Sequence, residues 1–105
     1  MIMVVAVIIS KPGMEKQVRQ LLDTLVAPSM AESGCLDIHL NEAIDKSGTF
    51  AFITRWRTEG DFDRHLSTPY VKAFLDKVPS LLSTPPAVQR WTIIAPASTN
   101  SRDPG

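Results

Sequence analysis

The spacing of hydrophobic residues changes several times along this chain, and each spacing predicts a different element. Nearly continuous valine and isoleucine over residues 2–10 predict a strand covered on both faces. Apolar residues at helical spacing over 18–26 predict a helix, which Pro28 should kink or end. Alternating apolar and polar residues over 36–41 and 50–57 predict two half-buried strands, which a short turn joins into an antiparallel hairpin.

Two more helices and one more strand follow the predicted hairpin. A capping box at residues 58–61 opens a short helix that continues through Leu66. Thr68 is then expected to cap a longer helix with Pro69 at its first position, because proline has no N–H to leave unpaired there. After a Pro-Pro pair, residues 88–95 predict a final strand.

The predicted order is β-α-β-β-α-β, which is typical of an α+β, ferredoxin-like domain with an antiparallel sheet. We expect this domain to span residues 1–95, followed by a flexible polar tail at 96–105. Helices cover only one face of such a sheet. The other face would carry Asp37, His39 and Arg55, with Asp37 and Arg55 paired across the hairpin, beside apolar residues of the first strand. A second copy of the chain is the simplest cover for this face, so we expect a homodimer.

Composition narrows the partners and the compartment. Eleven basic residues balance eleven acidic ones without a basic run, so neither nucleic acid nor a membrane surface is an expected partner. We expect the single cysteine, Cys35, to be a small buried side chain that packs in the core. A lone cysteine is compatible with a reducing compartment, so we expect a cytoplasmic protein. No phosphate-binding loop or metal-ligand spacing occurs in the sequence, and we expect no metal and no cofactor.

Several short motifs follow one another along the chain. They are Lys11-Pro12-Gly13, Leu21-Leu22, Gly34-Cys35-Leu36, the run 50–56 ending in Trp56, and His65-Leu66-Ser67-Thr68-Pro69 followed by Phe74. In this order, over about residues 2–95, they resemble the antibiotic biosynthesis monooxygenase family. The resemblance implies a dimeric α/β barrel with a pocket between sheet and helices. It also implies oxygenation of phenolic, quinol or polyketide-like aromatic substrates by O2, without metal, flavin or haem.

Two positions depart from the pattern of that family. Where the family usually has tyrosine on the second strand, this chain has Ile38, and where it usually has glutamate two residues before the tryptophan, it has Thr54. A symmetric hairpin makes Ile38 and Thr54 direct cross-strand neighbours. A polar pair that would face the pocket is therefore replaced as a unit.

Candidate site residues follow from the motifs. His65 is the candidate catalytic base, because an imidazole can exchange protons near neutral pH, although a half-buried structural histidine is the alternative. Trp56 is a candidate catalytic residue that would stack on a flat substrate, or a core residue. The expected substrate-binding residues are Ile38, Phe52, Thr54 and Phe74.

The sequence is compatible with three functions. The first is a cofactor-independent monooxygenase acting on a small hydrophobic aromatic substrate and O2. The second is a non-catalytic module that binds or senses a small molecule in the same pocket, which the replaced pair at Ile38 and Thr54 favours. The third is haem degradation, which would require a polar residue on the first strand, where Met3 to Ile8 are all apolar.

Overall fold

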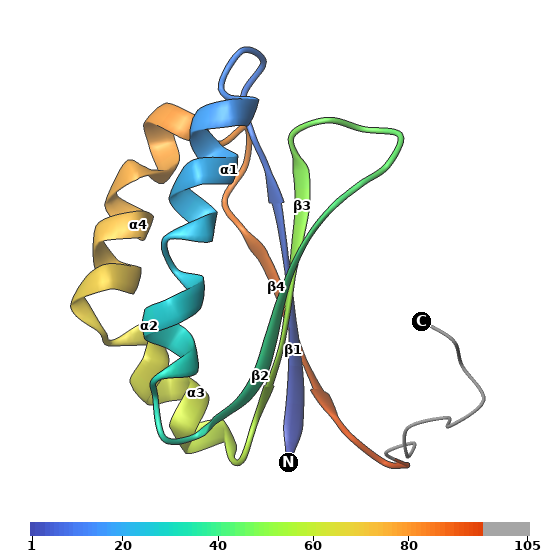
Figure 1. Ribbon diagram of the computed structural model, residues 1–105, viewed down its shortest axis with the longest axis vertical. Helices are drawn as coiled ribbons and strands as arrows, with labels where there is room; N and C mark the ends of the chain where they lie inside the picture. Colours follow the sequence, from blue (N-terminus) through green and yellow to red (C-terminus); the bar gives the residue numbers. More distant parts are fainter. Residues whose placement is uncertain (96–105) are drawn as a thin grey trace.

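A computed structural model describes residues 1–95 and shows a four-stranded antiparallel sheet with four helices on one face (Figure 1). The elements are β1 (Ile2–Ile9), α1 (Glu15–Asp23), α2 (Val26–Met30), β2 (Cys35–Glu42), β3 (Thr49–Trp56), α3 (Glu59–Leu66), α4 (Pro69–Leu81) and β4 (Ala87–Thr92). The strand order β2-β3-β1-β4 confirms the ferredoxin-like α+β fold. The tail predicted at 96–105 lies outside the described residues.

The hairpin of β2 and β3 has the register that the sequence predicts. Ile38 pairs with Thr54, and Asp37 pairs with Arg55 on the opposite face. Arg55 Nε donates to Asp37 Oδ2 over 2.7 Å, so the predicted cross-strand ion pair forms. A shift in register between Cys35 and Asp37 bends the start of β2.

The first helical region differs from its prediction. One helix interrupted by Pro28 is expected, but the chain forms α1 and α2 with a break at Thr24 and Leu25. Pro28 is the third residue of α2, in the first helical turn, where backbone N–H groups have no partner inside the helix. The proline is therefore compatible with the helix that it was expected to end.

The starts of α3 and α4 are held by different bonds. Thr58 Oγ1 accepts from the N–H of Asp61 over 3.1 Å, which confirms the predicted cap of α3. Thr68 stands at the cap position of α4, with Pro69 next to it, but its side chain caps nothing. Instead its hydroxyl donates to the carbonyl oxygen of His65 over 2.7 Å. Thr68 therefore ties the end of α3 to the start of α4.

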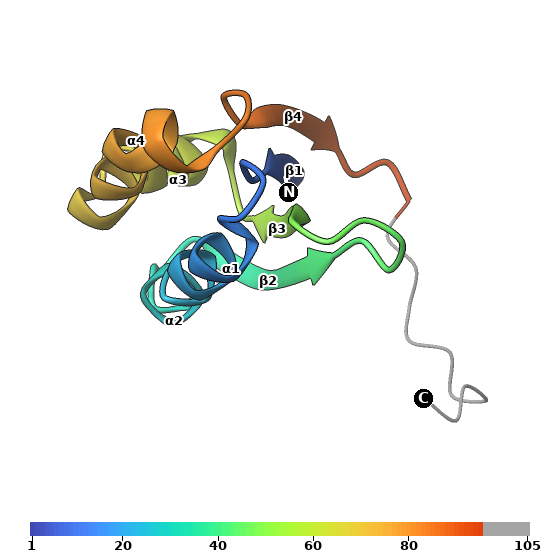
Figure 2. The ribbon, with the colours of Figure 1, turned by 90° about the horizontal axis from the view of Figure 1, so that it is seen from above.

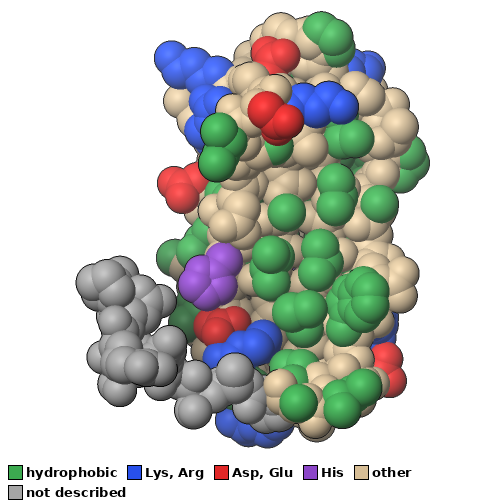
Figure 3. Space-filling model, turned by 90° about the vertical axis from the view of Figure 1, so that its right-hand side faces the viewer, with side chains coloured by type: hydrophobic (Ala, Val, Ile, Leu, Met, Phe, Trp, Pro, Cys, Tyr) green, Lys and Arg blue, Asp and Glu red, His purple; other side chains and the backbone are tan. Residues whose placement is uncertain are grey.

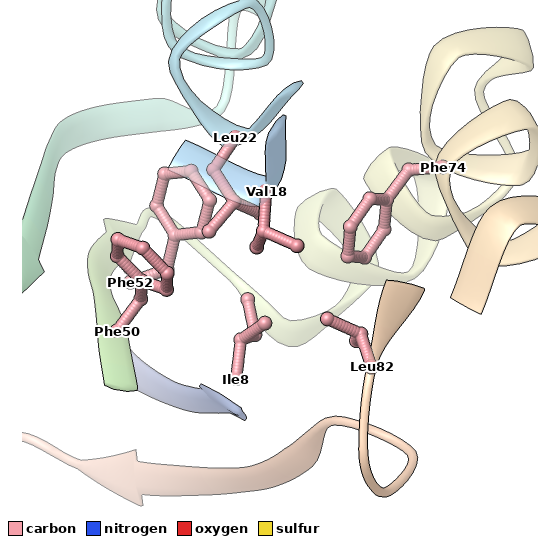
Figure 4. Packing of buried hydrophobic residues seen from close by; sticks show 7 residues of the cluster. All are labelled: Ile8, Val18, Leu22, Phe50, Phe52, Phe74 and Leu82. Atoms are coloured by element: carbon pink, nitrogen blue, oxygen red, sulfur yellow. The ribbon is translucent and has the colours of Figure 1, made fainter. Parts of the chain in front are cut away.

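Two groups of buried side chains lie between the sheet and the helices. One group, which we call the hydrocarbon cluster, packs β1 and β3 against α1 and α4 (Figure 4). The other, which we call the aromatic cluster, lies toward α3. The hydrocarbon cluster contains Ile8, Val18, Leu22, Phe50, Phe52, Phe74 and Leu82, and the aromatic cluster contains Ile2, Val4, Cys35, Trp56 and Phe62.

Within residues 1–95, no helix covers the other face of the sheet, as the view from above shows (Figure 2). Met3, Val5 and Val7 of β1 are only partly buried on this face. The sequence predicted that β1 is covered on both faces, but within residues 1–95 of one chain only its inner face is covered. Trp91 of β4 is 50% exposed. Apolar side chains gather over the middle of this face (Figure 3). Within residues 1–95, no helix is long and apolar enough to cross a bilayer.

Candidate active site

A cavity of about 110 Å³ lies between the two pairs of helices, above the centre of the sheet. Its floor comes from β1 and β3, one wall from Leu25 and Ser29, and the opposite wall from α3 and α4. Leu66, Leu75 and Val88 line it and are also partly exposed, so they mark its opening to solvent. The lining is apolar except for Ser29, Thr54 and His65.

His65 is the only histidine at this cavity, and a carboxylate holds its ring. The Nδ1 atom lies 2.7 Å from Oε2 of Glu32, with both side chains mostly buried. The same carboxylate oxygen accepts from the hydroxyl of Tyr70. Because Glu32 occupies Nδ1, the other ring nitrogen, Nε2, is the one that can meet a ligand. A carboxylate–imidazole pair of this kind fixes both the tautomer and the orientation of the base.

Aromatic rings pack around the imidazole. The ring centroid of Trp56 lies 4.8 Å from that of His65, and the ring of Phe62 stacks on His65 with centroids 5.7 Å apart. Trp56 is fully buried and is absent from the cavity lining, so it supports His65 from behind the wall. Trp56 therefore contacts the candidate base, and its predicted contact with a flat substrate stays a prediction.

Thr54 has a partner that the sequence did not suggest. Its Oγ1 accepts from the indole N–H of Trp56 over 2.8 Å, and both side chains are buried. The threonine that stands at the glutamate position of the family motif thus satisfies a buried indole N–H. Glu32 and Tyr70 bring a carboxylate and a phenol to His65 from other elements.

The loop that carries Glu32 fits closely against α3, which carries His65. A Cβ atom placed on Gly34 would lie 2.2 Å from Cγ of Asp61 in the first turn of α3. Only glycine allows this approach. The carbonyl oxygen of Gly34 also accepts from the N–H of Arg57 over 2.9 Å, at the end of β3. Together these contacts hold the loop of Glu32 beside the helix of His65.

Burial and charge act on two nearby titratable groups. Burial, together with the hydrogen bond to Glu32 and its charge, raises the pKa of Tyr70 to about 12. Burial, with the charges of Glu32 and Asp37, raises the pKa of the Cys35 thiol to about 11. Cys35 is buried, as predicted, and a thiol held protonated in this way is a poor nucleophile.

The predicted site residues lie in two places in the structure. The cavity lining includes Ile38, Phe52, Thr54, His65 and Phe74, which come from β2, β3, α3 and α4. Trp56 lies behind them. The sequence reasoning missed Glu32, Tyr70 and Ser29. Glu32 lies two residues before the Gly34-Cys35 motif and Tyr70 directly follows Pro69, but nothing in the sequence pairs either residue with His65. Within residues 1–95, no group of three His, Cys, Asp or Glu side chains is placed to hold a metal ion.

Known proteins share this sequence and this architecture. A model of the family described as "Antibiotic biosynthesis monooxygenase" matches residues 1–77. The chain is 32% identical over 83 residues to "Uncharacterized protein sll1783" of Synechocystis, a match covering 79% of this chain and 56% of that protein. It is also 32% identical over 93 residues to "Putative monooxygenase Rv0793" of Mycobacterium tuberculosis, covering 89% of this chain and 88% of that one.

Solved structures agree in fold. PA3566 from Pseudomonas aeruginosa superposes with a TM-score of 0.85 at 30% identity, covering 90% of this chain and 94% of that one. Rv0793 superposes with a TM-score of 0.86 at 30% identity, covering 92% and 98%. The family model spans most of the domain, and these relatives align along nearly all of it. The protein therefore belongs to the antibiotic biosynthesis monooxygenase family.

Proposed function

We propose that the protein is a cofactor-independent monooxygenase that oxidises a phenolic or quinol-type aromatic substrate with O2, and that His65 is its base. The observation that carries this proposal is the pair of Glu32 and His65 at the wall of an apolar cavity. A base that must accept a proton works best when a second group fixes its tautomer and stabilises its charged form. Membership of a monooxygenase family supports the reaction type.

The proposed reaction needs only positioning and a proton acceptor from the chain. His65 Nε2 takes the proton of the substrate hydroxyl, and the resulting phenolate passes one electron to O2. The phenoxyl radical and superoxide combine into a peroxide at a ring carbon. The O–O bond then breaks. One oxygen stays on the substrate as a carbonyl, and the other leaves as water with the proton from His65 and the hydrogen of the oxygenated carbon. The substrate thus loses two hydrogens and gains one oxygen.

The cavity indicates the size of the reacting part of the substrate. A cavity of about 150 Å³ is known to hold a benzene molecule, so about 110 Å³ suits one ring at most without side-chain movement. Ile38, Phe52 and Phe74 would contact that ring. Larger polyketide-like substrates would extend through the opening at Leu66, Leu75 and Val88. Trp56 would act as a positioning residue for His65.

The test is oxygen consumption with a panel of hydroquinones, naphthols and anthrones. His65→Ala should lower the rate about a hundredfold to ten-thousandfold, the usual contribution of a positioned base. The matched control is His39→Ala, because His39 is the only other histidine and lies on the opposite face of the sheet. Equal rates for His65→Ala and wild type, or no rate above background for wild type, would contradict the proposal.

The second candidate is a binding or regulatory module that uses the same cavity without turnover. Two observations favour this function. The hydroxyl of Thr54 is occupied by the indole N–H of Trp56. Among the described residues that line the cavity, His65 is the one ionisable side chain. Saturable binding of an aromatic ligand with no oxygen consumption would select this function. Haem degradation is less favoured, because a porphyrin is much larger than the cavity and β1 presents only apolar side chains to it.

We also propose that the protein works as a cytoplasmic homodimer in which the uncovered sheet faces meet. The partly exposed Met3, Val5 and Val7, with Trp91 beside them, form an apolar surface of the kind that dimers bury. The single unpaired thiol suits a reducing compartment. Sedimentation at micromolar concentration should give twice the mass of the chain, and a monomer would contradict the dimer.

A further inference from the structure

Tyr70 donates its hydroxyl to the carboxylate that holds the candidate base. Oε2 of Glu32 accepts from the Tyr70 hydroxyl and also lies 2.7 Å from Nδ1 of His65. A second acceptor, the carbonyl oxygen of Pro28, lies 3.3 Å from the Tyr70 hydroxyl. Burial, with the bond to Glu32, raises the pKa of Tyr70 to about 12, so the phenol keeps its proton and remains a donor at neutral pH. We call Glu32, His65 and Tyr70 the polar corner.

The side chain of Glu32 also borders a second depression, on the surface of the protein. Glu32 lies on the loop between α2 and β2, its side chain is 20% exposed, and it lines a polar groove of about 270 Å³. Arg64, which is exposed, lines the same groove and would attract a carboxylate that turned outward. The bond from Tyr70 opposes such a turn, because it would leave the hydroxyl of Tyr70 only the more distant carbonyl of Pro28.

The polar corner decides which hydrogen-bonding group His65 presents to the cavity. The carboxylate oxygen that accepts from Tyr70 also accepts from Nδ1, so in the neutral ring the proton is on Nδ1 and Nε2 carries a lone pair. The other polar lining residues do not compete, since the Thr54 oxygen accepts from Trp56 and the Ser29 Oγ is buried. A ligand in the cavity therefore meets an acceptor at Nε2 and has to bring a donor.

We propose that Tyr70 is a positioning residue, which holds the Glu32 carboxylate against Nδ1 of His65 and so makes the cavity selective for hydroxylated arenes over arenes whose oxygen carries no hydrogen. A phenol or quinol donates to Nε2, whereas a methyl ether leaves that nitrogen unpaired in an apolar cavity. This inference rests on the proposed function, because it concerns the same base and the same substrate class.

A matched phenol and methyl ether test the selectivity under nitrogen, where no turnover occurs. The probes are 4-ethylphenol and 4-ethylanisole, and titration calorimetry measures both dissociation constants. Wild type should bind the phenol about tenfold more tightly, because the ether leaves a buried acceptor unpaired. In Tyr70→Phe, which keeps the ring and loses only the hydroxyl, this ratio should fall to about threefold or less. Equal binding of the two probes by wild type, saturable binding of neither, or an unchanged ratio in Tyr70→Phe would overturn the proposal.

The tautomer of His65 separates a positioning role from a merely structural one. Long-range proton–nitrogen NMR correlations distinguish a protonated ring nitrogen from a bare one, in mildly alkaline solution where histidine rings are neutral. His65 should show a protonated Nδ1 in wild type and a mixture of both tautomers in Tyr70→Phe. His39, the only other histidine, lies on the opposite face of the sheet and should give the same signals in both proteins. A proton on Nε2 in wild type, or identical His65 signals in the two proteins, would overturn the proposal.

A milder change covers the case in which Tyr70→Phe does not fold. Tyr70 is the only tyrosine, so growth on 3-fluorotyrosine alters this residue alone. The fluorinated phenol is more acidic and donates more strongly to Glu32, so the nitrogen signals of His65 should move while those of His39 stay. Unmoved His65 signals would show that Tyr70 does not act on the base through Glu32.

These outcomes are separate from the test of the proposed function, because none of them involves oxygen. If His65→Ala abolishes oxygen consumption while Tyr70→Phe keeps its preference for the phenol, only the role of Tyr70 fails. If wild type consumes no oxygen but Tyr70→Phe loses that preference, the monooxygenase proposal fails and the polar corner stands as the selective part of a binding site.

Discussion

The two hydrophobic clusters on the inner face of the sheet are built from different kinds of side chain. The hydrocarbon cluster contains only aliphatic and phenylalanine side chains, so nothing in it needs a hydrogen bond (Figure 4). The aromatic cluster holds an indole N–H and a thiol, and it borders the polar corner of Glu32, His65 and Tyr70. Ile38 packs against both clusters. The polar groups therefore lie at the aromatic end of the domain, while the hydrocarbon cluster gives the cavity only apolar lining, from Ile8, Phe52 and Phe74.

Leu22→Ala should give the largest effect on stability. Leu22 is fully buried among the side chains of the hydrocarbon cluster, and truncating such a leucine costs about 2–5 kcal/mol of unfolding free energy. Urea unfolding would measure this loss, and at temperatures where the variant is folded its oxygen consumption should stay near that of wild type. A large loss of activity in folded Leu22→Ala would show that packing around Leu22, which does not line the cavity, also positions the groups around His65.

Thr54→Val, next to the aromatic cluster, should lower the free energy of unfolding by less than Leu22→Ala does. Valine keeps the shape of the side chain but leaves the indole N–H of Trp56 without its acceptor, which should cost about 1–3 kcal/mol of unfolding free energy. Activity should change little, because Thr54 carries no base. Trp56→Phe in the same background provides the control, since the double variant has no N–H to leave unpaired. A double-mutant cycle with no coupling between the two positions would contradict this assignment.

Raising the pH should give the smallest change in stability, and this change should come from Tyr70 and Cys35, near the aromatic cluster. Tyr70 is the only tyrosine, so tyrosinate absorbance reports it alone, and in the folded protein it should appear near a pKa of about 12 instead of 10.0. The raised pKa means that the folded state holds the proton more tightly than the unfolded one. The resulting stabilisation is complete below pH 10.0 and is lost as pH rises toward about 12.

Ionisation of Cys35 should also lower the stability of the folded protein, at a lower pH than that of Tyr70, because its pKa is raised from 9.0 to about 11. Tyr70→Phe and Cys35→Ala should each flatten their part of the alkaline decline in stability. Tyrosinate that forms in the folded protein near pH 10.0 would contradict the contact between Tyr70 and Glu32.

Local patterns in the sequence were enough to predict the sheet. Period-two alternation and a short turn fixed the pairing of Ile38 with Thr54, because hairpin register depends on residues close in sequence. The motif around His65 placed it at the cavity. Glu32 could not be found in this way, because it meets His65 across 33 positions from a loop without periodicity. The break at Thr24 was also missed, because Pro28 looked like the stronger signal although the first turn of a helix accepts proline.

The close approach at Gly34 has a consequence for how this domain can vary. Any side chain at position 34 would meet Asp61 and push α3 away from the loop, and so separate Glu32 from His65 without changing either residue. A residue that touches neither side chain would then control the contact between Glu32 and His65. The Cβ of Asp61 would itself lie 2.3 Å from a Cβ at position 34, so a substitution there becomes tolerable only together with glycine at 61, and the two sites are expected to change as a pair.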